Sequence, residues 1–274
     1  MRSRLEVLRP IAAIALAAVF FFPIYIVVMG MLKPADKIQS SPLGLPLQPT
    51  GENLGAVLGR SDGLFWSALL NSVQITVLSV VLLTLLSAML AHYLVRSHAL
   101  WTKPAMLVLL AGLMIPPAVI LQPVTQVLGA AGLMNSVVGV VASNVAYYLP
   151  FGVFVFSGFV GTVPVEIEEA ASIDGASRFR LFWQVVFPIM RPAAASVMIF
   201  LGVWVWNDFL TPLIILGPEA GTTVTVGVYR SVGEYSTNFG TLYAFSFLAS
   251  LPVLLFFVAL QKQFVAGLTA GSVK

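Results

Sequence analysis

The chain has 274 residues, of which 59% are hydrophobic and 9% charged, and its formal net charge at pH 7 is +3. Soluble domains carry about 25% charged residues, so this composition excludes an ordinary soluble domain and predicts an all-α membrane protein. The absence of cysteine excludes disulfides, thiolate metal sites and cysteine nucleophiles. The excess of basic residues fits membrane-flanking loops, so we expect the lipid bilayer, and no nucleic acid, as a partner.

The first apolar run extends from about residue 10 to residue 32 and follows Arg2, Arg4 and Arg9. A cleaved secretory signal would have a shorter apolar region and a small-residue cleavage site, so we predict an uncleaved transmembrane helix. Residues 33–64 are rich in proline and glycine and predict an extracytoplasmic loop that is ordered by contacts and has little regular structure. Helix and loop together form the expected N-terminal part, residues 1–64.

Five further apolar runs approach or exceed the roughly 20 residues that a helix needs to cross a bilayer. They cover about residues 65–95, 103–124, 135–161, 190–216 and 241–262. The sequence therefore predicts six transmembrane helices, with a transmembrane core over residues 65–264 and a C-terminal tail over residues 265–274. Prolines within the third and fourth spans are either gating kinks or fixed bends; they are Pro116, Pro117 and Pro150.

The distribution of Lys and Arg predicts the orientation of these spans. If the N-terminus is cytoplasmic, ten of the fourteen Lys and Arg residues lie on the cytoplasmic side. The other four are Lys33, Lys37, Arg60 and Arg230. The positive-inside rule therefore places both termini, and the loop between the fourth and fifth spans, in the cytoplasm.

That loop is unusually polar and has the pattern of two short helices. Pro164 suits the first turn of a helix, and Glu168 and Glu169 lie near the positive end of its dipole. Gly175 is a suitable C-terminal cap, and Ser177 is placed to cap a second, amphipathic helix. An exposed helix of this kind can enter a cleft on another protein. The alternative is a loop held by lipid headgroups, which acidic residues disfavour beside an anionic leaflet.

The loop contains Glu169-Ala170-Ala171, then Gly175, and after nine residues Val185-Val186-Phe187-Pro188. This string resembles the "EAA" signature of permease subunits in ABC-type importers, which ends in Ile-x-Leu-Pro; the apolar character of the changed residues is kept. The stretches "NSVQITVLSVVLLTLLSAMLAHYLVR", "WVWNDFLTPLIIL" and "FVAGLTAGSVK" are similar to the second span, fifth span and C-terminal tail of carbohydrate importers of the maltose-transporter family. The resemblance covers nearly the whole chain.

The resemblance implies a type I ABC importer (MetI-like) permease fold in a bacterial or archaeal inner membrane. It implies that residues of about 164–174 form a coupling helix that docks into a groove on a separate ATPase. The coupling residues would be Glu168, Glu169, Ala170, Ala171, Asp174, Gly175 and Pro188. The C-terminal tail would reach the ATPase dimer through Gly267, Thr269 and Gly271.

The partners implied are a second permease, in a heterodimer, two copies of an ABC ATPase, and an extracytoplasmic protein that delivers a sugar or oligosaccharide. The chain lacks the G-x-x-x-x-G-K-[ST] loop, so we expect ATP and Mg²⁺ to be bound by the ATPase and no cofactor or enzymatic activity in this chain. His92 and His98 are interpreted as interfacial side chains rather than metal ligands. No catalytic or metal-binding constellation is apparent.

Polar residues inside the spans are candidates for the substrate path. A carboxylate such as Asp208 costs about 2.5–3.5 kcal/mol at the bilayer centre, so it should face protein or water unless it lies near the outer surface. Sugars are held by hydrogen bonds and aromatic stacking. The candidates are Asn71, Gln74, Gln122, Asn144, Tyr147, Tyr148, Trp206, Asn207 and Asp208. Such residues can equally join neighbouring helices, and the partner permease can be the subunit that holds the substrate.

Other functions stay open. An importer of the same family could carry another small solute, such as glycerol phosphate. An ion-coupled secondary transporter would usually have more spans and intramembrane charges, and Asp208 alone is thin support. An integral membrane enzyme would need a catalytic cluster, and a structural or channel subunit would have no evident use for the polar loop.

Overall fold

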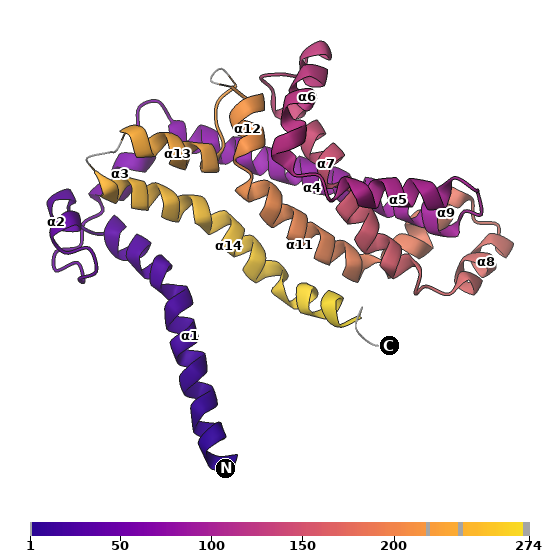
Figure 1. Cartoon of the computed structure of the whole chain (residues 1–274), viewed down its shortest axis with the longest axis horizontal. Helices are drawn as coiled ribbons and strands as arrows, with labels where there is room; N and C mark the ends of the chain where they lie inside the picture. The colour runs from indigo at the N-terminus through magenta and orange to yellow at the C-terminus, as the bar shows by residue number, and fades with distance from the viewer. Residues whose placement is uncertain (1, 218–219, 235–237, 271–274) are drawn as a thin grey trace. The chain divides into compact units, whose positions relative to one another are not determined.

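The computed structural model describes residues 2–217, 220–234 and 238–270, and all regular structure in these ranges is helical (Figure 1). The chain forms two compact units, Met1–Leu69 with Val224–Pro252, and Leu70–Thr223 with Val253–Lys274. The helices are α1 (Arg2–Met31), α2 (Ala35–Ser40), α3 (Glu52–Leu58), α4 (Leu64–Arg96), α5 (Thr102–Gly112), α6 (Pro117–Ala130), α7 (Val137–Val160), α8 (Val165–Ile173), α9 (Arg178–Leu181), a π-helix η1 (Phe182–Val186), α10 (Phe187–Ile189), α11 (Arg191–Asn207), α12 (Leu210–Ile215), α13 (Val224–Glu234) and α14 (Phe239–Ala270).

In the described residues, four helical segments are long and apolar enough to cross a membrane, or up to six if each of two bent pairs counts as one span. The four are Arg9–Met31, Leu64–Arg96, Val137–Val160 and Phe239–Ala259. The bent pairs are Thr102–Gly112 with Pro117–Ala130, at 108°, and Arg178–Ile189 with Arg191–Asn207, at 75°. Six spans is thus the upper end of what the structure supports.

Two expected spans are not the straight helices that the apolar runs predict. The expected helix 103–124 breaks before Pro117, because the Pro116–Pro117 pair removes two backbone donors and Pro116 is extended (ψ 138°). The expected helix 190–216 ends at Asn207, and extended Asp208 (ψ 128°) separates it from α12. By contrast, Pro150 lies within the continuous helix α7. Hydropathy identified the apolar runs but not these breaks.

The loop of the first unit is ordered by contacts, as expected, but it has more regular structure than predicted. The loop carries α2 and α3, and Asn53 of α3 is buried. Its Nδ2 donates to the carbonyl oxygens of Met31 (2.9 Å) and Lys33 (2.8 Å), which satisfies acceptors at the end of α1. Buried Lys33 donates in turn to the carbonyl oxygens of Ser41 (2.6 Å) and Pro42 (3.1 Å). Two buried side chains therefore hold a segment that its composition marked as irregular.

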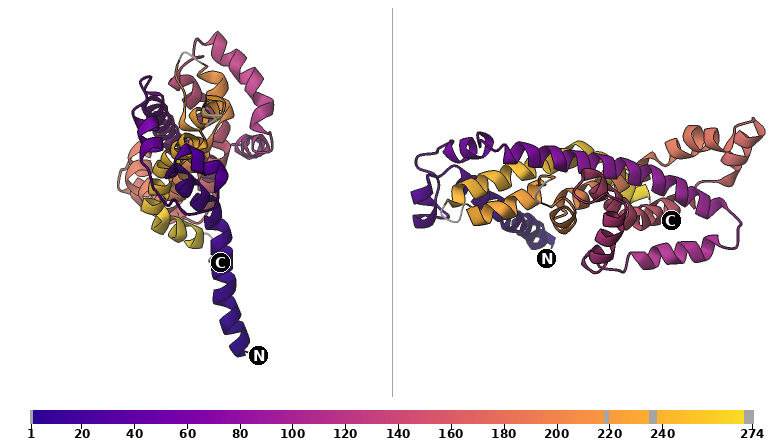
Figure 2. Two further views of the ribbon diagram at one scale, coloured as in Figure 1. Left: turned by 90° about the vertical axis from the view of Figure 1, so that its left-hand side faces the viewer. Right: turned by 90° about the horizontal axis from the view of Figure 1, so that it is seen from above.

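The second unit is built around one apolar cluster with buried residues from α4, α7, η1 and α11. Figure 1 labels α4, α7 and α11, and Figure 2 shows the chain from two further sides. The fully buried members of the cluster include Leu83, Phe156, Val186 and Leu201. A side chain at Gly152 of α7 would collide with Ser87 of α4, so glycine allows the two helices to approach closely. The apolar side chains exposed on the outer faces of these helices suit contact with lipid.

Candidate functional site

The segment with the Glu-Ala-Ala string, residues 164–188, is called the signature segment below. It begins with Pro164 in extended conformation (ψ 134°) directly before α8. Gly175 ends the helix with a positive φ of 83°, and the amides of Gly175 and Ala176 donate to carbonyl oxygens of α8. Ser177 Oγ accepts from the Arg180 amide (3.3 Å) and caps α9. The predicted helix, glycine turn and capped second helix are confirmed.

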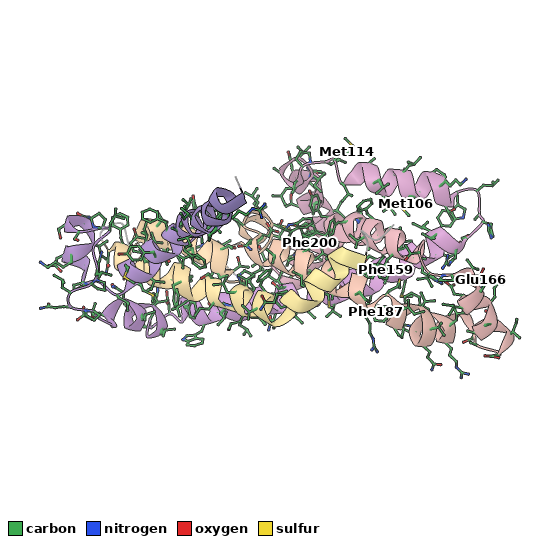
Figure 3. The ribbon with its side chains drawn as sticks, turned by 90° about the horizontal axis from the view of Figure 1, so that it is seen from below. Met106, Met114, Phe159, Glu166, Phe187 and Phe200 are labelled. Carbon is green, nitrogen blue, oxygen red and sulfur yellow. The ribbon has the colours of Figure 1, made fainter. Side chains whose placement is uncertain are left out.

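The second helix is less regular than predicted. Only Arg178–Leu181 is α-helical; Phe182–Val186 forms the π-helix η1, and Phe187–Ile189, including Pro188, continues as α10. The Trp183 Nε1 atom is buried with no hydrogen-bond partner among the described residues. Figure 3 shows the side chains of this region, with Phe187 on α10 and Glu166 on α8. A π-helix has no simple sequence pattern, so an amphipathic period could not reveal it.

Most predicted coupling residues are exposed on α8 or at its end. Glu169, Ala170, Asp174 and Gly175 are exposed, and the neighbouring Ile173 exposes 86% of its surface. Ala171 is half-buried against the apolar cluster of the second unit. The exposed surface of α8 therefore offers carboxylates, a small side chain and apolar side chains, Ile173 among them, to a partner.

Glu168 differs from its neighbour Glu169, because its carboxylate is turned inward and is engaged within the chain. The side chain of Glu168 exposes 11% of its surface. Arg96 Nε donates to Oε1 at 2.8 Å, and His92 Nε2 donates to Oε2 at 2.9 Å. Arg96 Nη2 also donates to the carbonyl oxygen of Val163 at 2.7 Å. We call Glu168, Arg96 and His92 the Glu168 cluster.

Sequence reasoning missed the Glu168 cluster. Arg96 counted only toward the orientation of the spans, and His92 only as an interfacial side chain. The available signal was their spacing of four residues, which places both on one face of α4. A cavity of about 870 Å³ adjoins the cluster and is lined by residues from the end of α4, α8 and α9.

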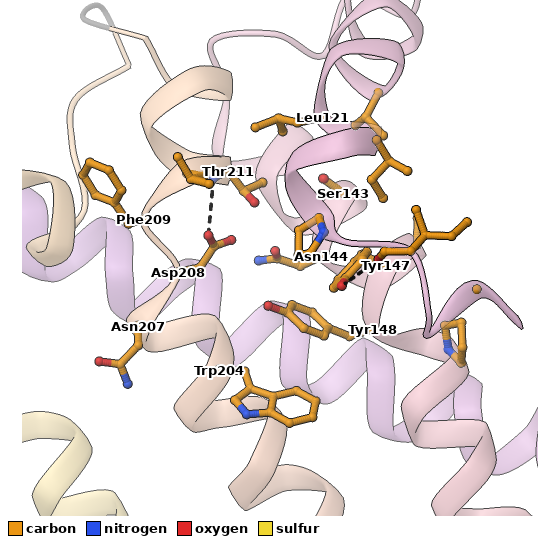
Figure 4. A pocket seen from close by; sticks show the side chains of 18 residues that line it. Leu121, Ser143, Asn144, Tyr147, Tyr148, Trp204, Asn207, Asp208, Phe209 and Thr211 are labelled. Atoms are coloured by element: carbon orange, nitrogen blue, oxygen red, sulfur yellow. Dashed lines mark hydrogen bonds between the residues drawn. The ribbon is translucent and has the colours of Figure 1, made fainter. Parts of the chain in front are cut away.

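A second cavity, of about 570 Å³, lies among α6, α7, α11 and α12 (Figure 4). Its lining includes five of the predicted path residues: Asn144, Tyr147, Tyr148, Asn207 and Asp208. It also includes Trp204, Ser143 and Thr211, which sequence reasoning did not select. Figure 4 shows Asp208, Asn144 and Tyr148 converging on the same space, whereas Asn207 points away from it. The structure therefore gathers residues from two of the predicted spans around one cavity.

Aromatic rings and polar groups line this cavity in an ordered arrangement. The Tyr148 ring lies 4.9 Å from Tyr147 and 5.8 Å from Trp204, measured between ring centroids. Asp208 Oδ1 accepts from the Thr211 amide at 3.3 Å, and Asn144 Nδ2 donates to Ser79 Oγ at 3.4 Å. None of the described residues that line the cavity is Lys, Arg or His. Such a space can stack and hydrogen-bond a polar solute without offering it a cation.

The remaining predicted path residues lie outside this lining. Asn71 Nδ2 donates to the carbonyl oxygens of Thr222 (3.0 Å) and Ala220 (3.4 Å), so it holds the segment before α13. Gln74 and Gln122 are exposed, and Trp206 is buried. Of the predicted tail contacts, Gly267 and Thr269 lie in α14 where side chains fall outside the described residues, and Gly271 lies outside them altogether.

Comparisons with known proteins agree with this architecture. Residues 84–269 match the family model described as "Binding-protein-dependent transport system inner membrane component". A melibiose/raffinose/stachyose import permease of Bacillus subtilis (strain 168) is 32% identical over 98% of this chain and 97% of its own length. A diacetylchitobiose uptake permease of Streptomyces coelicolor is 32% identical over 93% of this chain and 85% of its own.

Among solved structures, a chain of a bacterial ABC transporter involved in import of the acidic polysaccharide alginate superposes with a TM-score of 0.81. The two are 18% identical, over 96% of this chain and 97% of that one, so the likeness shows a shared fold. The family match extends over the signature segment and both cavities. The chain belongs to the family of inner membrane components of binding-protein-dependent transport systems.

Proposed function

We propose that the chain is one permease subunit of an ATP-driven ABC importer for a sugar or oligosaccharide. The observation that carries this is the near full-length similarity to permeases named for melibiose, raffinose and stachyose and for diacetylchitobiose. A second permease completes the path, and an extracytoplasmic binding protein delivers the substrate, in keeping with the family description.

The chemistry of the 570 Å³ cavity supports a neutral carbohydrate. Tyrosine and tryptophan rings offer flat faces for the C–H faces of a sugar, and Asn144 offers an amide for hydroxyl groups. Asp208 adds a carboxylate, with no basic residue among the described lining to balance it. A uronic acid would meet like charge there, so neutral sugars are favoured over acidic ones.

The signature segment is the proposed contact with the ATPase. This chain has no nucleotide-binding loop, so energy must be supplied by a partner that binds ATP and Mg²⁺. Glu169 and Asp174 present carboxylates for basic residues of that partner, and Ala170 allows close approach. The loop and both termini are then cytoplasmic, as the Lys and Arg distribution predicts.

A second candidate substrate is a small osmolyte. An uptake permease for osmoprotective compounds of Synechocystis is 34% identical over 81% of this chain and 74% of its own length. A cavity of this polarity also suits a small neutral polyol. The two candidates differ in size, so a ligand panel separates them.

Purification of the tagged chain in a mild detergent tests this proposal. We expect an ATPase and a second permease to elute with it, and the cognate binding protein to be stabilised thermally by neutral oligosaccharides. Stabilisation by small osmolytes alone would favour the second candidate. Elution without any ATPase, together with uptake that follows an ion gradient, would indicate a secondary transporter.

A further inference from the structure

We propose that Arg96 and His92 are positioning residues that clamp α8 to the end of α4 through Glu168. The coupling helix and the second half of α4 then move as one body during transport. This inference rests on the proposed role of α8 as the contact with an ATPase. In this proposal Glu168 holds α8 to α4, whereas its exposed neighbour Glu169 contacts the ATPase.

The clamp holds both sides of the start of α8. Each carboxylate oxygen of Glu168 has its own donor on α4, at 2.8 Å from Arg96 and 2.9 Å from His92. The second contact of Arg96, to the Val163 carbonyl oxygen at 2.7 Å, fixes the chain just before the helix begins. Charge-assisted hydrogen bonds at Glu168 and at Val163 restrict the rotation of the start of α8 as well as its distance from α4.

The three side chains are shielded from water. Arg96 and His92 each expose 18% of their side-chain surface, and Glu168 exposes 11%. Ion pairs on an open surface contribute little, but here the loss of one partner would leave the other charge buried and unpaired. The cluster is therefore held as a unit, and its geometry is specific.

Helix α8 and the turn that follows it also make apolar contacts. Ala171 and Ala176 pack against the apolar cluster of the second unit, and α8 contacts α9 and η1. That route continues through a π-helix and a 75° bend before α11. Helix α4, in contrast, runs for 33 residues without an internal proline. A push on α8 is transmitted through the clamp to the continuous helix α4, and through the contacts with α9 and η1 to an element that bends before α11.

Transport and ATP hydrolysis should be measured together in the intact complex in proteoliposomes. In Glu168→Gln and Arg96→Gln, we expect ATP hydrolysis to continue while solute molecules imported per ATP fall roughly tenfold, within the usual range of coupling effects. The exchanged pair, Arg96→Glu with Glu168→Arg, should recover part of the loss. Glu166→Gln is the matched control, because Glu166 is exposed on the same helix.

A distance measurement tests the clamp without depending on transport. The chain has no cysteine, so Tyr93→Cys on α4 and Val165→Cys on α8, both exposed, can carry spin labels. We expect one narrow distance distribution that ATP does not change, and a broader one when Glu168→Gln is added. If the distribution is already broad, or shifts with ATP, in the chain that keeps Glu168, Arg96 and His92, the proposal is overturned.

Unchanged import per ATP in both single variants would also overturn the clamp. Absence of ATP-driven import by the complex without substitutions would instead count against the proposed function, with the narrow distance still expected. If a single variant fails to assemble, the exchanged pair is measured in its place. The spin-label distance in the chain that carries only the two introduced cysteines needs neither variant, and a broad distribution there contradicts the clamp.

Discussion

At the scale of single residues, two adjacent carboxylates face opposite ways. Glu168 is turned toward α4 and engaged by Arg96 and His92, while Glu169 is exposed. Adjacent positions on a helix are about 100° apart, so the 3.6-residue repeat separates them into an inward and an outward role. The Glu-Ala-Ala string identified the pair from sequence, but nothing local marks which of the two has an internal partner.

Glu169→Lys should reverse the charge on the exposed face of α8 and weaken docking of the ATPase. Like charges across an interface are strongly unfavourable, so we expect less ATPase in the purified complex and a matching loss of solute uptake. Glu52→Lys makes the same charge change at an exposed residue of α3, outside the signature segment, and is the control. Full uptake and full ATPase recovery in Glu169→Lys would contradict the docking role.

Trp204→Ala should weaken substrate binding in the cavity. An aromatic contact contributes about 0.5–1.5 kcal/mol, so we expect the KM of uptake to rise by roughly two- to tenfold with little change in ATP hydrolysis. Trp101 is also exposed and lies outside the lining of the cavity, which makes Trp101→Ala the control. Equal KM values for Trp204→Ala and the unsubstituted permease would remove the cavity from the substrate path.

At the scale of elements, periodicity and capping residues predicted what depends on neighbours in sequence. The apolar runs, α8, its glycine turn and the Ser177 cap were predictable, because each depends on a few adjacent residues. The 108° bend before Pro117 has a local cause in the proline pair, but hydropathy does not reveal its angle. The π-helix and the buried Asn53 depend on tertiary contacts, and so does the Glu168 cluster, which joins residues more than 70 positions apart. Pairing over that distance leaves no mark in a single sequence.

Gly175→Ala should destabilise the turn after α8, because φ there is 83° and a Cβ disfavours this conformation. We expect a loss of about 1 kcal/mol, measured as a lower midpoint of thermal unfolding in detergent. Gly158 of α7 has open space around it and no positive φ, so Gly158→Ala should be neutral or slightly stabilising. Equal midpoints of thermal unfolding for Gly175→Ala and Gly158→Ala would contradict the role of Gly175 in this turn.

At the scale of the whole molecule, the composition alone placed the chain in a membrane, and the family match places it among permease components. The distribution of Lys and Arg predicts the direction of insertion, and the exposed carboxylates of the signature segment support the proposed contact with an ATPase. In this proposal the signature segment receives the work of a separate ATPase.

Solute uptake by proteoliposomes that hold the complete complex, with ATP enclosed and binding protein outside, tests this most directly, with a labelled neutral oligosaccharide that the binding protein accepts. We expect uptake to require both ATP and binding protein, to survive the collapse of ion gradients, and to be lost in Glu169→Lys. Uptake of that oligosaccharide that continued without ATP and ceased when an ion gradient was collapsed would contradict the role of the ATPase.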